Sequence, residues 1–133
     1  MGLAEAAAVR SEDPYRQVGA VILRPDNSVA SVGYNGAPPG VALNWASRDA
    51  YRLFVIHAEV NALRYCTRSE VRAGLLASTT IPCPNCLTSI AAHGIDNVVF
   101  RSYRSTTENN QASINAADTL GINISYLPKR TQP

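Results

Sequence analysis

The sequence is poor in lysine, in aromatic residues and in long apolar runs. Lys129 is its single lysine beside eleven arginines, and the formal net charge is only +2. So small and scattered a charge argues against nucleic acid as a partner. No apolar run approaches the ~18 residues that a membrane-spanning helix needs, so no membrane segment is expected. Arginine makes forked contacts with phosphate and carboxylate, so the arginine-rich composition is compatible with an anionic ligand.

Cysteine is scarce as well, with Cys66, Cys83 and Cys86 making an odd count among 133 residues. With no secretory segment at the start, this count argues against a disulfide scaffold and favours a reducing, cytoplasmic setting with metal ligation. Cys66 falls on the apolar side of an expected helix and is interpreted as a small core residue. The length and the 46% hydrophobic content predict one domain over residues 1–133.

The periodicity predicts a helix and two strands, followed by three alternations of helix and strand. The expected helices cover 3–9, 57–66, 82–93 (after an opening turn) and 105–121, and the expected strands cover 17–23, 29–34, 75–80, 95–100 and 122–127. Ser105 and Glu108 match a capping box, and 129–133 is interpreted as a tail. The first two strands should form an antiparallel hairpin, and right-handed crossovers should make the last three parallel. We therefore expect a three-layer α/β/α fold with a five-stranded mixed sheet.

The most reactive side chains form a pattern typical of a catalytic metal site. Cys83 and Cys86 stand at zinc-ligand spacing where a helix begins, and a helix N-terminus favours thiolates. With His57 they make three ligands, which leave the fourth tetrahedral position open for water. Glu59 could take a proton from that water and pass it to a substrate. Together with Pro82 these residues match H-x-E…P-C-x-x-C, the known pattern of zinc-dependent deaminases.

A long irregular stretch, 35–51, separates the second strand from this site. Its first half is rich in glycine and proline, and so long a loop in a compact domain usually binds a ligand. Asn35, at the end of the strand, is a candidate hydrogen-bonding clamp.

The sequence resembles the deoxycytidylate (dCMP) deaminases of the cytidine deaminase superfamily. The resemblance runs from about residue 3 to about residue 127 and rests on blocks in the right order: Ser11-Glu12-Asp13-Pro14, Gln17-Val18-Gly19-Ala20-Val21, Gly33-Tyr34-Asn35-Gly36, His57-Ala58-Glu59-Val60-Asn61-Ala62, Pro82-Cys83-Pro84-Asn85-Cys86 and Gly94-Ile95. The chain lacks the extra Cys and His residues that give some members a second, structural zinc.

The resemblance implies hydrolytic conversion of dCMP to dUMP and ammonia, with dUMP feeding thymidylate synthesis. It implies that His57, Cys83 and Cys86 bind one zinc ion and that Glu59 shuttles protons to N3 of cytosine. Asn35, Ala58 and Pro82 would surround the sugar and base. The loop residues Tyr34, Gly36, Ala37 and Gly40 resemble an effector site for dCTP, or for dTTP with Mg²⁺. A homo-oligomer, whether dimer, tetramer or hexamer, is also implied.

The phosphate contact is the least defined part of the prediction. The candidates are Arg48, Arg52, Arg101 and Arg104, with Tyr103 beside them. Other substrates stay open, namely cytidine or deoxycytidine, guanine, and adenosine in tRNA. An inactive zinc module that only binds a nucleotide is the alternative outside enzymes. In nucleoside cytidine deaminases the last two strands are typically antiparallel, so the helix expected between them here favours the dCMP branch.

Overall fold

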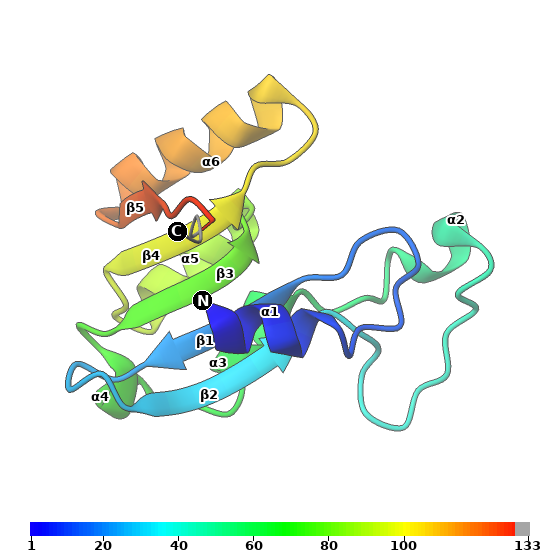
Figure 1. The fold of residues 1–133 in the computed structure, drawn as a ribbon, viewed down its shortest axis with the longest axis horizontal. Helices are drawn as coiled ribbons and strands as arrows, with labels where there is room; N and C mark the ends of the chain where they lie inside the picture. The colour runs from blue at the N-terminus through cyan, green and yellow to red at the C-terminus, as the bar shows by residue number, and fades with distance from the viewer. Residues whose placement is uncertain (130–133) are drawn as a thin grey trace.

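The computed structural model describes residues 1–129 (Figure 1). The strands are β1 (Gly19–Leu23), β2 (Val29–Tyr34), β3 (Leu75–Thr80), β4 (Asn97–Ser102) and β5 (Asn123–Tyr126). The helices are α1 (Gly2–Ala8), α2 (Arg48–Tyr51), α3 (Ala58–Leu63), α4 (Arg68–Val71), α5 (Pro84–Ala92) and α6 (Thr107–Leu120). The tail predicted at 129–133 lies outside the described residues except for Lys129.

The strands form one sheet in the order β2-β1-β3-β4-β5. β1 is antiparallel to both of its neighbours, whereas β3, β4 and β5 are parallel. The parallel half follows from α5 and α6, each of which returns the chain to the same end of the sheet before the next strand begins. This confirms the mixed five-stranded sheet and the parallel arrangement of its last three strands.

Helices cover both faces of the sheet, as Figure 1 shows with α1 in front and α3 and α5 behind. Successive side chains of a strand point to opposite faces, so Ile22 and Leu76 face α3 and α5 while Val21 and Ala77 face α1. The larger buried cluster lies on the α3 and α5 side and includes Ile22 and Leu76. The rigid layer formed there is what carries the site described below.

Two glycines let helices lie unusually close to the sheet. A Cβ on Gly19 would lie 1.8 Å from the carbonyl oxygen of Ala4 in α1, and one on Gly33 would lie 2.5 Å from the backbone nitrogen of Ala62 in α3. Neither position has room for a methyl group. Gly33 therefore sets the distance between β2 and the helix that follows His57.

Several local predictions were wrong or incomplete. α6 is capped by Thr106, whose Oγ1 accepts from the Asn109 N–H at 3.2 Å, so the predicted box of Ser105 and Glu108 does not form. The first strand begins at Gly19 rather than at residue 17, because the Val18 N–H donates to the side chain of Asn35. The two four-residue helices α2 and α4 were not predicted at all. Within residues 1–129, no helix combines the length and the apolar character needed to cross a membrane.

Candidate active site

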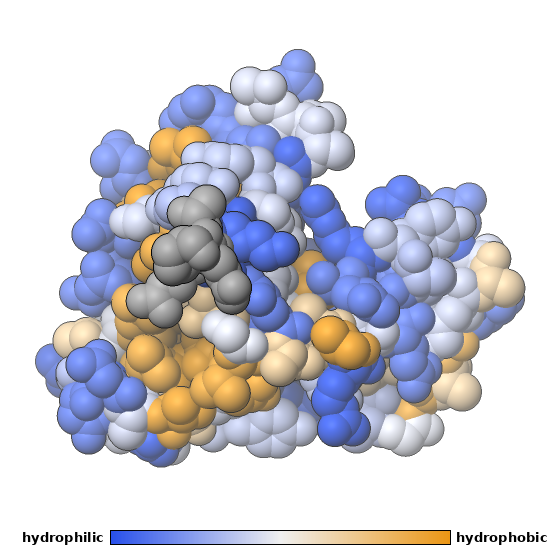
Figure 2. All heavy atoms as spheres, viewed as in Figure 1, coloured by the Kyte–Doolittle hydropathy of each residue, from blue (hydrophilic) through white to orange (hydrophobic). Residues whose placement is uncertain are grey.

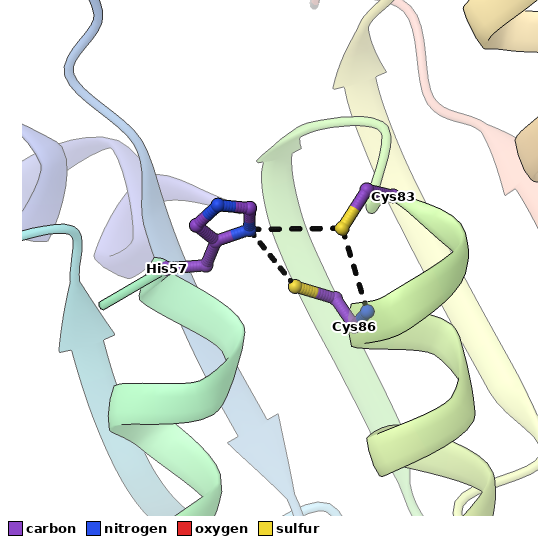
Figure 3. A group of neighbouring side chains, drawn as sticks. All are labelled: His57, Cys83 and Cys86. Carbon is purple, nitrogen blue, oxygen red and sulfur yellow. Dashed lines mark hydrogen bonds between the residues drawn. The ribbon is translucent and has the colours of Figure 1, made fainter. Parts of the chain in front are cut away.

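The N-termini of α3 and α5 bring one imidazole and two thiols together (Figure 3). His57 is the N-cap of α3, and Cys83 is the N-cap of α5, with Pro84 in the first turn where no N–H is required. The His57 Nδ1 atom lies 3.1 Å from the Cys86 Sγ and 3.6 Å from the Cys83 Sγ. All three donor atoms lie within 4.8 Å of one another.

This geometry fits a tetrahedral zinc ion. Ordinary Zn–S and Zn–N bond lengths at a tetrahedral angle place sulfur and nitrogen about 3.6 Å apart, close to the observed separations. One imidazole and two thiolates leave a fourth position free, as in catalytic zinc sites. In the described part of the chain no other group of three such donors comes together.

The protonation of each of these three groups depends on its hydrogen bonds with the others, as expected of side chains that bind a cation together. Hydrogen bonds, first with Cys86 and then with His57, lower the pKa of the Cys83 thiol. The hydrogen bond with Cys83, followed by burial, raises the pKa of Cys86, and the bond to Cys83 also raises the pKa of His57. One thiolate thus forms readily and keeps its neighbours protonated, and a divalent cation would replace those protons.

Glu59 is the second residue of α3 and is only 4% exposed. The Ser78 hydroxyl donates to its Oε1 at 3.0 Å. Ser78 is fully buried on β3 and shares the sheet face of Leu76, which is why it reaches the helix behind the sheet. Ser78 therefore fixes the direction of the carboxylate beside the metal cluster.

A cavity of about 220 Å³ opens at this point. Its lining combines four arginines and two carboxylates with apolar side chains. The complete set of lining residues is Asp13, Arg16, Val18, Asn35, Arg48, Tyr51, Arg52, Val55, His57, Ala58, Glu59, Thr80, Ile81 and Arg104. Figure 2 shows hydrophilic residues on both sides of a notch between the α2 loop and the start of α6. The cavity thus combines one candidate metal donor (His57), a buried carboxylate (Glu59) and an excess of positive charge.

A family model, the cytidine and deoxycytidylate deaminase zinc-binding region, matches residues 1–102. The chain belongs to the cytidine and deoxycytidylate deaminase family. The matched residues contain His57, Cys83 and Cys86, so zinc is the metal that this cluster suits.

Relatives and a solved structure agree with the family assignment. A deoxycytidylate deaminase of Mycobacterium phage D29 is 41% identical over 115 residues, which cover 75% of this chain and 89% of the relative. One of Pongo abelii is 32% identical over 140 residues, covering 97% and 78%. The crystal structure of the dCMP deaminase of cyanophage S-TIM5 in complex with dCMP and dUMP superposes with a TM-score of 0.80 at 28% identity, over 95% of this chain and 92% of that one.

Several residues that the sequence suggested for this deaminase line the cavity, and others do not. Glu59, His57, Ala58, Asn35, Arg48, Arg52 and Arg104 line it. Pro82, Arg101 and Tyr103 are not among its lining residues. Arg101 instead pairs with Glu5 of α1, and Tyr103 stacks on Tyr126 with ring centroids 5.4 Å apart. The effector-loop residues line a second cavity described below.

Asn35 has an internal role that its sequence position alone does not show. Its Oδ1 accepts from the Val18 N–H at 2.8 Å, and its Nδ2 donates to the Arg16 carbonyl at 2.8 Å. One lone pair of Oδ1 remains for a ligand. Asn35 thus fixes the backbone of Val18 and Arg16, which line the cavity, and also lines the cavity itself.

Sequence reasoning missed Arg16, Asp13, Tyr51 and Ser78 as parts of the site. Asp13 stood in a block that carried the family resemblance, so a role beyond the turn could have been suspected there. Ser78 is a polar residue within a buried strand, which is the pattern that a hydrogen bond to a buried partner produces.

Proposed function

We propose that the chain is a zinc-dependent dCMP deaminase that converts dCMP and water to dUMP and ammonia, supplying dUMP for thymidylate synthesis. The arginine-rich cavity that is lined by His57 and Glu59 carries this proposal, because the thiols of Cys83 and Cys86 lie within 4.8 Å of the His57 donor atom. The metal cluster and carboxylate account for the deamination, and the arginines account for a phosphate on the substrate.

His57, Cys83 and Cys86 would hold the zinc ion. When bound, zinc supplies a Lewis acid that brings the pKa of water from 15.7 to about 7. Glu59 accepts the proton of the attacking water and delivers it to N3 of cytosine as C4 gains oxygen. The same carboxylate then takes the remaining proton from the new hydroxyl on C4 and gives it to the leaving nitrogen, so that the C–N bond breaks, ammonia departs and the C4 carbonyl of uracil forms. The Ser78 hydrogen bond keeps Glu59 aimed through both transfers.

The apolar part of the cavity suits the base. Val18, Val55 and Ile81 line the cavity that also holds Glu59. Apolar walls around a reacting centre limit water and strengthen the charge interactions inside. Asn35 and the backbone at Ala58 supply polar groups beside them for sugar and base.

The charged part of the cavity suits the phosphate. Arg16, Arg48, Arg52 and Arg104 all line the cavity. The Arg104 Nε atom is buried without a hydrogen-bond partner in the described structure, and a buried donor is normally paired. A phosphate oxygen would give this N–H the acceptor that it lacks.

The topology favours a nucleotide over the nucleoside alternative. β4 and β5 are parallel and are joined by the 14-residue α6, which is the arrangement expected for the dCMP branch rather than for nucleoside cytidine deaminases. A net charge of only +2 gives little support to a tRNA substrate. Glu59 is present and buried, which argues against an inactive module.

A second cavity, of about 410 Å³, supports an effector site. The predicted loop residues Tyr34, Gly36, Ala37 and Gly40 line it, together with Arg10 and Arg64. The aromatic side chains and the two arginines of this cavity suit the base and the phosphates of a nucleoside triphosphate, such as the predicted effectors dCTP and Mg²⁺-dTTP.

The exposed apolar side chains of Val32 and Tyr34, on the edge strand β2, support a homo-oligomer. The free thiols Cys66, Cys83 and Cys86 support a reducing, cytoplasmic location.

An ammonia-release assay with the zinc-loaded chain tests the proposal. The panel is dCMP, dCTP, deoxycytidine and guanine at equal concentrations. We expect kcat/KM for dCMP to exceed that for deoxycytidine by at least about 100-fold, since loss of a buried charged contact costs a few kcal/mol. Equal efficiency on deoxycytidine, or a preference for guanine, would overturn the substrate assignment.

A further inference from the structure

Asp13 is a buried carboxylate surrounded by donors from its own chain. Its Oδ1 accepts from the backbone N–H groups of Tyr15 at 2.8 Å and Arg16 at 3.2 Å, and from the Tyr51 hydroxyl at 3.0 Å. Its Oδ2 accepts from the Asn35 side chain at 3.4 Å. A buried charge is tolerated when hydrogen bonds replace water, so these donors hold Asp13 in one position.

Tyr51 joins this carboxylate to a distant part of the chain. It is the last residue of the short helix α2, lies 38 residues from Asp13 and is 2% exposed. Its ring packs against Trp45, with centroids 4.7 Å apart, and against Tyr15 at 6.3 Å. Burial, followed by the bond to Asp13, raises the pKa of Tyr51 to about 12, so its hydroxyl remains a donor at neutral pH.

Three of the four cavity arginines are arranged around this pair. Arg16 gives its own backbone N–H to Asp13. The Arg48 guanidinium lies over the ring of Tyr15, 5.5 Å from its centroid, and Arg52 directly follows Tyr51. None of the three side chains forms a buried ion pair in the described structure, because Arg52 contacts only the exposed Asp49 at 3.7 Å. Their guanidinium groups remain available to the cavity.

We infer that the hydrogen bond between Asp13 and Tyr51 positions Arg16, Arg48 and Arg52 to receive the phosphate of the substrate, and so sets the preference for nucleotide over nucleoside. Asp13 and Tyr51 are positioning residues, because they act through the arginines and not on the reacting atoms. The inference rests on the proposed function. A four-residue helix cannot hold its place by itself, so the bond from Tyr51 to Asp13 supplies a fixed point for α2.

Binding to the zinc-loaded Glu59→Gln chain tests the inference without turnover. Adding Tyr51→Phe removes one hydroxyl and keeps the ring that packs on Trp45. We expect the Kd for dCMP to rise about tenfold, corresponding to about 1.4 kcal/mol, with the Kd for deoxycytidine unchanged. In the active chain the same substitution should raise KM for dCMP and leave kcat and zinc content unaltered. Tyr126→Phe, on the exposed edge strand β5, is the matched control and should change neither constant.

A double-mutant cycle separates positioning from general stability. In a chain that already carries Arg48→Gln, Tyr51→Phe should weaken dCMP binding by clearly less than tenfold, because part of its effect passes through Arg48. Equal weakening of dCMP and deoxycytidine, full additivity with Arg48→Gln, or failure of the Tyr51→Phe chain to fold would each overturn the inference. If the unaltered chain preferred deoxycytidine to dCMP, the proposed function would fail instead, which is a distinct result.

Discussion

Replacing Gly33 by alanine should damage catalysis although Gly33 does not line the cavity that holds His57 and Glu59. The added Cβ would lie 2.5 Å from the Ala62 nitrogen and 2.6 Å from the Ala58 carbonyl oxygen, both in the backbone of α3. Ordinary contact begins at 3.4 Å, so β2 and α3 must separate by about 0.9 Å. α3 carries His57 and Glu59 at its start, and β2 leads into Asn35, so either movement displaces a wall of the site.

The expected loss follows from that displacement. A misplacement of about 1 Å can cost about 100-fold in rate, and forcing a methyl group into a filled space costs about 1–3 kcal/mol of stability. We therefore expect kcat/KM for dCMP to fall about 100-fold in Gly33→Ala, with a free energy of unfolding lower by about 1–3 kcal/mol.

Steady-state deamination, urea unfolding and zinc analysis on the same preparation measure these changes. Gly2→Ala is the control, because nothing lies within 4 Å of a Cβ there, and it should keep full activity. A Gly33→Ala chain with normal kcat/KM and normal stability would refute the close approach of β2 and α3.

The other predictions concern the metal, the carboxylate and acid stability. Cys86→Ser should lose bound zinc by elemental analysis, and retention of one zinc per chain would show that the ligand set is different. Ser78→Ala should lower kcat about tenfold, as expected for loss of a hydrogen bond to the charged Glu59, while zinc content stays constant; an unchanged kcat would remove Ser78 from the mechanism. Hydrogen bonds, first from the Thr67 backbone, lower the pKa of Glu70 below its ordinary 4.5. The ionised Glu70 therefore stabilises the folded chain above pH 4.5, and this stability is lost as the pH falls through the lowered pKa of the folded state. Urea unfolding should therefore show a steeper loss of stability on acidification for the unaltered chain than for Glu70→Gln, and parallel curves would contradict this.

The periodic parts of the fold could be predicted from sequence because each long element has a repeating apolar face. The three parallel strands followed from the helices between them, and the zinc donors followed from spacing and from helix starts. The short helices α2 and α4 could not be found in this way, since four residues are too few to show a period. The Thr67 and Glu70 pair, which forms the capping contact of α4 at 3.0 Å, was the one local signal for it.

The parts of the site that sequence did not reveal depend on contacts between distant residues. Nothing local connects Asp13 with Tyr51, or Glu59 with Ser78. Consecutive hydroxyl residues, Ser105, Thr106 and Thr107, are all chemically able to cap α6, so the start of that helix was misplaced by sequence reasoning. Arg101 and Arg104 look alike in sequence, yet only the fold shows that Arg101 pairs with α1 while Arg104 reaches the cavity.

The most direct test of the central claim compares dUMP formation by zinc-loaded wild-type and Glu59→Gln chains. Gln keeps the size of the side chain and removes its ability to carry a proton. We expect both chains to hold one zinc ion, and the variant to lose at least about 1000-fold in kcat on dCMP, within the range of general acid–base catalysis. A Glu59→Gln chain that holds zinc and forms dUMP at the wild-type rate would contradict the account.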